Sequence, residues 1–300
     1  MPELAEVGVG RTDSSLVSFL ARRIGGDASS WRKWVRFVIY LALVLNTFYY
    51  FYLDGVTYSV LLADAPLIQH VQTFATTIDY GGWLFLMAAF QLQTYWEDQA
   101  QISRKQLSGL LVLIAAGAAA LFLALYLFVL DYYFYDHFSP YPSGQVCALA
   151  NGQTYLLDDW QLYEELTPEN CVTLSRTEVY MHALEPTLVS AQNLEEGIEL
   201  AVIEVINALV WIILVGLVQF GLLAERVWPQ RTLLLRVLGR IKLLFYGVLL
   251  VDALYWLVYG LWVDAWDAFL WLFAVMAVQM KTSGPSESET SESTPAHASS

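Results

Sequence analysis

Apolar residues occur in six long runs, separated by more polar segments. A helix needs about 20 mostly apolar residues to cross a bilayer, because hydrocarbon cannot hydrogen-bond exposed backbone groups. The pattern predicts an all-α polytopic membrane protein with a six-helix transmembrane bundle. Its spans are expected at about 35–53, 80–96, 107–130, 200–224, 243–262 and 266–280. The second span could start earlier, since 67–78 is amphipathic and could belong to the same helix.

The polar segments divide the chain into five parts. These are a cytoplasmic N-terminal segment (1–34), transmembrane helices one to three (35–130), an extracytoplasmic domain (131–193), transmembrane helices four to six (194–280) and a cytoplasmic tail (281–300). The tail is rich in Ser, Thr, Glu and Pro and has little to bury, so it is predicted to be disordered. The segment 55–79 is broken by Asp64 and Pro66, and is either an outer loop or a re-entrant segment.

The basic residues predict the orientation of the bundle. With six crossings, every Lys and Arg except Arg176 falls on one side of the membrane. Basic residues near span ends favour the cytoplasmic side. Both termini are therefore predicted to be cytoplasmic, and the disulfide-permissive outer segment suggests the inner membrane of a bacterium.

Composition supports a membrane protein and excludes some partners. The chain is 57% hydrophobic and 15% charged, whereas soluble domains average about 45–50% and about 25%. Its net charge is −14. A nucleic-acid partner is not expected, because phosphate binding needs a basic surface. The predicted topology places most carboxylates on the outer side, where they would concentrate cations or attract a basic partner.

The extracytoplasmic domain contains both cysteines of the chain, Cys147 and Cys171. They are predicted to form a disulfide, although two unpaired thiols are the alternative. Asn151-Gly152 lies between two β-prone runs and predicts a hairpin there. Downstream, Asn193 is followed by two glutamates and predicts the N-cap of the fourth span.

Two carboxylates fall well inside predicted spans, and such groups are costly unless they face protein or water. Asp252 lies near the middle of the fifth span, and Glu204 lies in the outer half of the fourth. Helical spacing places Tyr255, with Trp256 and Tyr259, on the face of Asp252, where these donors could solvate the carboxylate. A polar file for protons or cations would consist of Asp252, Glu204, Tyr255, Asn207 and Asn46, with Gln91 and Gln93 adding buried polar groups. The alternative is a protonated Asp252 that simply ties helices together by a hydrogen bond to a tyrosine.

Other patterns give weaker candidates. Glu178, His182 and Glu185 would share one face of a helix, as a metal site or as an ordinary surface face. The small residues 115–120, with Gly109, predict close helix packing and a candidate homo-oligomer interface on the third helix. Enzyme signatures are absent, so neither catalysis nor a cofactor is expected.

Two classes of function remain for this lipid-embedded chain. The first is a proton- or cation-handling channel or transporter that uses the polar file. The second is a non-transporting envelope sensor or assembly protein that binds through its outer domain. Convergence of the polar residues on one water-accessible cavity would favour the first class.

Overall fold

The computed structural model describes residues 28–60, 67–97, 103–159, 162–228 and 230–282. Most of the N-terminal segment 1–34 and nearly all of the tail 281–300 lie outside the described residues. The expected disorder of the tail therefore stays a prediction. The chain forms two compact units, one of Val44–Phe269 and one of Met1–Leu43 with Leu270–Ser300. All sites described below belong to the Val44–Phe269 unit.

The described chain is mostly helical. Its long helices are α2 (Ala28–Val60), α4 (Ala75–Glu97), α5 (Arg104–Tyr135), α7 (Ala191–Val227), α8 (Thr232–Val258) and α9 (Trp262–Thr282), and a short helix, α3 (Leu67–Gln72), precedes α4. Within the described chain, α2, α5, α7 and α8 contain segments long and apolar enough to cross a membrane. The helices α4 and α9 occupy the second and sixth predicted spans but are not among these four, so length and hydropathy establish four membrane-length helices.

Local signals in the sequence define several helix ends. Ser103 and Gln106 form a capping box at the start of α5. The start of α7 is capped by Ser190, whose hydroxyl accepts from the Asn193 backbone N–H at 3.1 Å. The prediction that Asn193 is the cap is wrong, because the helix begins earlier than the apolar run. Between α8 and α9, Gly260 has a φ of 81°, which glycine adopts without strain.

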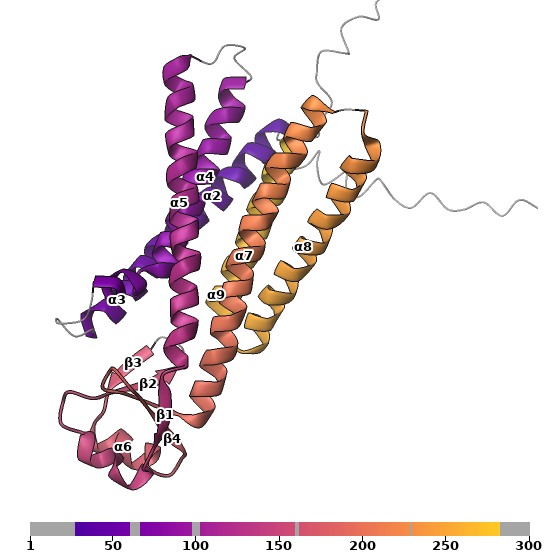
Figure 1. Cartoon of the computed structure of the whole chain (residues 1–300). Coiled ribbons are helices and arrows are strands. Elements are labelled where there is room, and N and C mark those ends of the chain that lie inside the picture. Colours follow the sequence, from indigo (N-terminus) through magenta and orange to yellow (C-terminus); the bar gives the residue numbers. More distant parts are fainter. Residues whose placement is uncertain (1–27, 61–66, 98–102, 160–161, 229, 283–300) are drawn as a thin grey trace, which may run out of the picture. The chain divides into compact units, whose positions relative to one another are not determined.

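Two glycines allow α4 and α5 to pack closely side by side (Figure 1). A Cβ added at Gly117 of α5 would lie 3.0 Å from the Gly82 carbonyl oxygen of α4 and 3.0 Å from Leu86. Part of the predicted small-residue face is therefore used within the chain. Ala115, Ala116 and Ala119 remain exposed, so the candidate homo-oligomer interface stays a prediction.

Between α5 and α7 the chain forms a small domain with a five-stranded sheet, here called the strand domain (136–190). Its strands are β1 (Phe138–Tyr141), β2 (Tyr155–Asp159), β3 (Leu162–Glu165), β4 (Val179–His182) and β5 (Thr187–Ser190). The spatial order is β1-β4-β5-β2-β3, with β2 and β5 parallel and the other pairs antiparallel. The sheet is larger than the single hairpin predicted from the sequence.

The predicted hairpin at Asn151-Gly152 is wrong. Residues Ser143–Leu149 form a 3-10 helix, and β2 pairs with β3 and β5 instead. The turn itself exists, because Gly152 has a φ of 78° and the Gln153 N–H donates to the Asn151 side chain. Partners distant in sequence provide the strand pairing, which a short-range turn signal cannot reveal.

The predicted disulfide is confirmed. Cys147 in the 3-10 helix and Cys171 in α6 (Pro168–Leu174) are bonded, with Cα atoms 5.1 Å apart. Cys171 lies in the core of the domain, which also contains Val146, Leu156, Leu166, Leu174, Val179 and Leu188. A disulfide supports a domain whose core is as small as this one.

The strand domain is anchored on the ends of α5 and α7 (Figure 1). Tyr135 of α5 packs with Leu157, Val189 and Ala201. A Cβ at Gly197 of α7 would lie 2.5 Å from the Tyr135 ring, so only glycine leaves room for this ring. This junction places the strand domain beside α3 and the ends of the bundle helices.

Candidate functional site

Asp267 is the centre of a buried polar group that joins three helices. Its side chain, on α9, is 7% exposed. The Asn46 amide of α2 donates to one carboxylate oxygen, and the Tyr80 hydroxyl of α4 donates to the other. The Tyr80 ring stacks on Tyr50 of α2, with centroids 4.6 Å apart. One carboxylate thus connects α2, α4 and α9.

Two more carboxylates receive hydrogen bonds from neighbouring helices. The Tyr50 hydroxyl donates to Asp264 of α9 at 2.6 Å. Asp54 of α2, also 7% exposed, accepts from both the backbone N–H and the hydroxyl of Thr77 in α4, at 3.1 and 2.6 Å. Neutral donors therefore hold these groups in place.

Glu204 of α7 lies among further carboxylates. It interacts electrostatically with four of them: Asp54, Asp79, Asp131 and Asp264. Its Oε2 atom is buried and has no hydrogen-bond partner among the described residues. Asp79 accepts from the Trp83 indole and also lies within electrostatic range of Asp267. We call the set formed by Asp54, Asp79, Glu204, Asp264 and Asp267 the carboxylate cluster.

The sequence provides little positive charge near this cluster. No Lys or Arg occurs in 37–103, 177–225 or 243–280, which are the stretches that contribute the five carboxylates. Buried charges of one sign repel one another strongly unless a proton or a cation compensates them. The arrangement can therefore take up positive charge.

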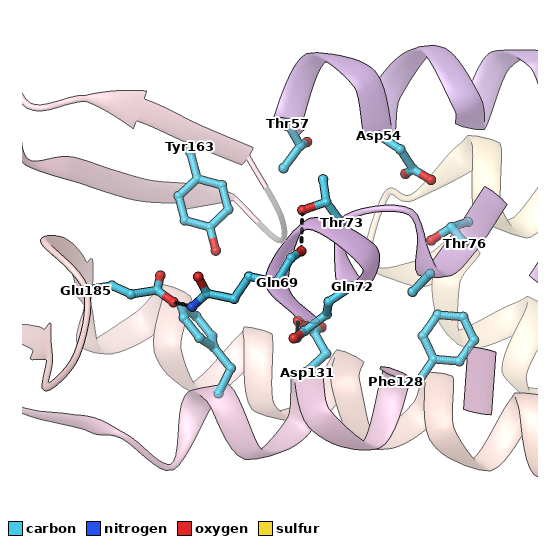
Figure 2. A pocket seen from close by; sticks show the side chains of 12 residues that line it. Asp54, Thr57, Gln69, Gln72, Thr73, Thr76, Phe128, Asp131, Tyr163 and Glu185 are labelled. Carbon is cyan, nitrogen blue, oxygen red and sulfur yellow. Dashed lines mark hydrogen bonds between the residues drawn. The ribbon is translucent and has the colours of Figure 1, made fainter. Parts of the chain in front are cut away.

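A partly enclosed cavity of about 100 Å³ lies where α2, α3 and α5 meet the strand domain (Figure 2). Asp54 of the carboxylate cluster lines it, so the cavity adjoins that cluster. Gln69 and Gln72 of α3 and Asp131 of α5 contribute further polar groups. Tyr163 of β3 and Glu185, between β4 and β5, approach from the strand domain, while Phe128 and Phe134 of α5 add apolar surface.

Hydrogen bonds hold the polar walls of this cavity. The Gln69 amide donates to Glu185, and the Gln72 amide approaches Asp131 at 3.4 Å. Burial raises the pKa of Glu185. Burial, followed by the charges of Asp131 and Glu185, raises the pKa of the Tyr163 hydroxyl. The phenol therefore stays protonated near both carboxylates and can donate a hydrogen bond.

The structure joins two residues of the predicted polar file, Asp252 and Asn207, and gives Asn46 and Tyr255 other hydrogen-bond partners. Asp252 is buried, and the Asn207 amide donates to it at 3.3 Å, so α7 and α8 are joined there. Asn46 belongs to the Asp267 group. The predicted solvation of Asp252 by tyrosines is wrong, because the hydroxyls of Tyr255 and Tyr259 donate to Glu199 of α7, at 3.0 and 2.9 Å. These two phenols lie toward the end of α8, where Glu199 is the nearer acceptor.

The helix predicted to align Glu178, His182 and Glu185 is also wrong. Val179–His182 is strand β4, and neighbouring side chains of a strand point to opposite faces. His182 is buried against Phe134, with ring centroids 4.4 Å apart, while Glu178 is exposed. Among the described residues, no three His, Cys, Asp or Glu side chains are close enough to hold a metal ion.

Sequence reasoning missed most of the carboxylate cluster. Asp54, Asp79 and Asp264 lie just outside the predicted spans, and Asp267 lies at the very start of the sixth. Helices α2, α4 and α9 continue through these positions. A signal was present for three of these four aspartates, which have an aromatic neighbour at helical spacing: Tyr50 for Asp54, Trp83 for Asp79 and Trp271 for Asp267.

Comparisons with known proteins found no matching family model, no matching curated protein and no matching solved structure.

Proposed function

We propose that this chain is a proton- or cation-handling channel or transporter of a membrane. The observation that carries the proposal is the carboxylate cluster, where electrostatic interactions link five acidic side chains on helix segments without Lys or Arg. Ionisable groups inside a helical bundle commonly mark ion or proton pathways. The cluster replaces Asp252 as the centre of the pathway, and Asp252 with Asn207 forms a second polar contact between α7 and α8.

The topology that goes with this function has six crossings. The helix α4 packs against the membrane-length helix α5 through Gly82 and Gly117, which supports a crossing by α4 as well. The distribution of Lys and Arg then supports cytoplasmic termini and a strand domain on the outer side. The disulfide fits an oxidising outer compartment, and the inner membrane of a bacterium fits both features.

A flux assay in proteoliposomes tests the function. The wild type should dissipate a pH gradient or carry a monovalent cation, and Asp267→Asn should reduce that flux to the background of empty vesicles. Asn keeps the shape of the side chain but removes its charge. Asp136→Asn is the matched control, because Asp136 is exposed at the end of α5. Equal flux in wild type and Asp267→Asn, or no flux for any cation, would reject the proposal and leave a sensor or assembly role.

A further inference from the structure

The cavity beside the strand domain differs from a bare metal-ion site in its lining. Metal ions such as Ca²⁺ need six to eight oxygen ligands at about 2.3–2.6 Å. Here Asp54, Asp131 and Glu185 are spread over three walls, and no metal-binding group of three such side chains occurs among the described residues. Phe128 and Phe134 contribute apolar surface to the wall. A cation held there must satisfy carboxylates and also cover apolar surface.

An alkylammonium ion meets both requirements. Its N–H groups can donate to Asp131, Glu185 and the amide oxygens of α3, which are acceptors around the cavity. Its hydrocarbon part can lie against the phenylalanine rings, and ammonium groups are attracted to ring faces. The Tyr163 hydroxyl lies within electrostatic range of Asp131 and Glu185, and its ring lines the cavity on the side of the strand domain.

The size of the cavity limits the ligand. Apolar cavities of about 150 Å³ hold a benzene ring. A cavity of about 100 Å³ therefore accepts an ion with only a few non-hydrogen atoms. Among the described residues, no Lys or Arg lines the cavity, so the carboxylates there meet only neutral donors, the amides of Gln69 and Gln72.

We propose that this cavity binds a small alkylammonium ion, as the outer access site of the pathway that begins at Asp54. The inference deepens the proposed function and rests on it for the role of the site. Asp131 and Glu185 hold the ammonium group, the phenylalanines cover the alkyl group, and the amides of Gln69 and Gln72 orient the two carboxylates. Asp54 links the site to the carboxylate cluster.

Titration calorimetry of the full chain in lipid nanodiscs tests the binding, with ethylammonium chloride as the probe and NaCl as the reference. Wild type should bind ethylammonium in preference to Na⁺. Asp131→Asn and Glu185→Gln should each weaken ethylammonium binding by about tenfold or more, since each removes a charge-assisted hydrogen bond. Glu178→Gln is the control, because this strand-domain glutamate is exposed and does not line the cavity.

Several results would overturn the inference. They are the absence of ethylammonium binding in wild type, binding of Na⁺ with equal strength, or binding unchanged in both carboxylate variants. The two proposals fail separately. Asp267→Asn should lose flux and keep ethylammonium binding, because Asp267 is not part of the cavity. Flux without ethylammonium binding rejects the cavity alone, whereas binding without any flux supports the cavity and rejects transport.

Discussion

Individual side chains show how the bundle tolerates acidic residues. Asp267 accepts from two neutral donors, Asn46 and Tyr80, and each donor comes from a different helix. Such hydrogen bonds stabilise a buried carboxyl group without adding charge, and losing one leaves a buried acceptor unsatisfied. The contacts that hold the Asp267 side chain therefore also hold helices together.

Tyr80→Phe tests this structural role. The variant removes one hydrogen bond to Asp267 and keeps the ring that stacks on Tyr50, so it should lower stability by about 1–3 kcal/mol. The measurement is thermal unfolding in detergent. Tyr126→Phe, at a position 53% exposed on α5, is the control and should change little. Equal unfolding temperatures for Tyr80→Phe and wild type would contradict the role.

His182 makes the stability of the strand domain depend on pH. Burial, followed by the nearby His137, lowers the pKa of His182 from 6.5 to about 4. The unfolded chain therefore takes up a proton near pH 6.5, while the folded domain resists protonation down to about pH 4. Stability from the neutral imidazole is complete above pH 6.5 and is lost as the pH falls toward 4.

Hydrogen exchange of the amides in β4 and β5, corrected for intrinsic rates, measures this effect. Protection in wild type should fall between pH 6.5 and about 4 more steeply than in His182→Gln. His137→Gln keeps the buried imidazole and should retain most of the pH dependence. Burial of Glu185 changes stability with pH in the opposite direction. Its raised pKa favours the folded state as the pH falls. Parallel pH profiles for wild type and His182→Gln would refute the assignment.

Helix packing accounts for the way α4 lies against α5. The run of small residues in α5 is readable from the sequence and predicts close packing, but it does not reveal the partner. The structure identifies Gly82 of α4 as that partner. Close approach of two backbones depends on glycine, since larger residues force the helices apart.

Gly117→Val should therefore lower stability by about 1–3 kcal/mol, because the added carbons meet the Gly82 carbonyl group and Leu86. Gly109→Val is a matched control on the same helix, where an added Cβ meets nothing within 4 Å. Unfolding in detergent should separate the two variants clearly. The same unfolding midpoint for both would exclude a tight α4–α5 contact.

Sequence patterns predicted some secondary-structure elements more accurately than others. Apolar runs located all the long helices of the described residues, because burial in lipid requires an uninterrupted pattern. The ends were less accurate: α2 continues to Val60 and α7 starts at Ala191, well beyond their apolar runs. The sheet was missed except for a turn, since the parallel pairing of β2 with β5 joins segments about 30 residues apart. The disulfide could be predicted because the chain has only two cysteines.

The sequence predicted the type of site, a set of buried acidic and polar side chains, but not which residues form it. Their position inside apolar runs predicted that Asp252 and Glu204 are buried acids, but a single helix pattern could not determine which helices are neighbours. Asn46 was correctly chosen as a polar group, but its partner is Asp267 and not Asp252. Tyr255 was paired with the wrong carboxylate for the same reason.

At the scale of the whole molecule, the proposed six crossings require Ser103 and Glu178 to lie on opposite sides of the membrane. In a chain lacking Cys147 and Cys171, a single cysteine introduced at either position shows by its labelling on which side of the membrane that position lies. Glu178→Cys should react with an impermeant maleimide in intact spheroplasts, whereas Ser103→Cys should react only after permeabilisation. Labelling of Ser103→Cys in intact spheroplasts would instead fit a chain in which α4 does not cross.

The central claim concerns the chain as a whole: positive charge crosses the membrane through the carboxylate cluster. Current measurement on proteoliposomes adsorbed to a solid-supported membrane tests it most directly, with a pair of variants on α7. Glu204→Gln neutralises the cluster member that lies among the other carboxylates, and Glu195→Gln neutralises an exposed acid on the same helix. The account predicts currents in wild type and Glu195→Gln and none in Glu204→Gln. Equal currents in all three, or no current in wild type, would contradict it.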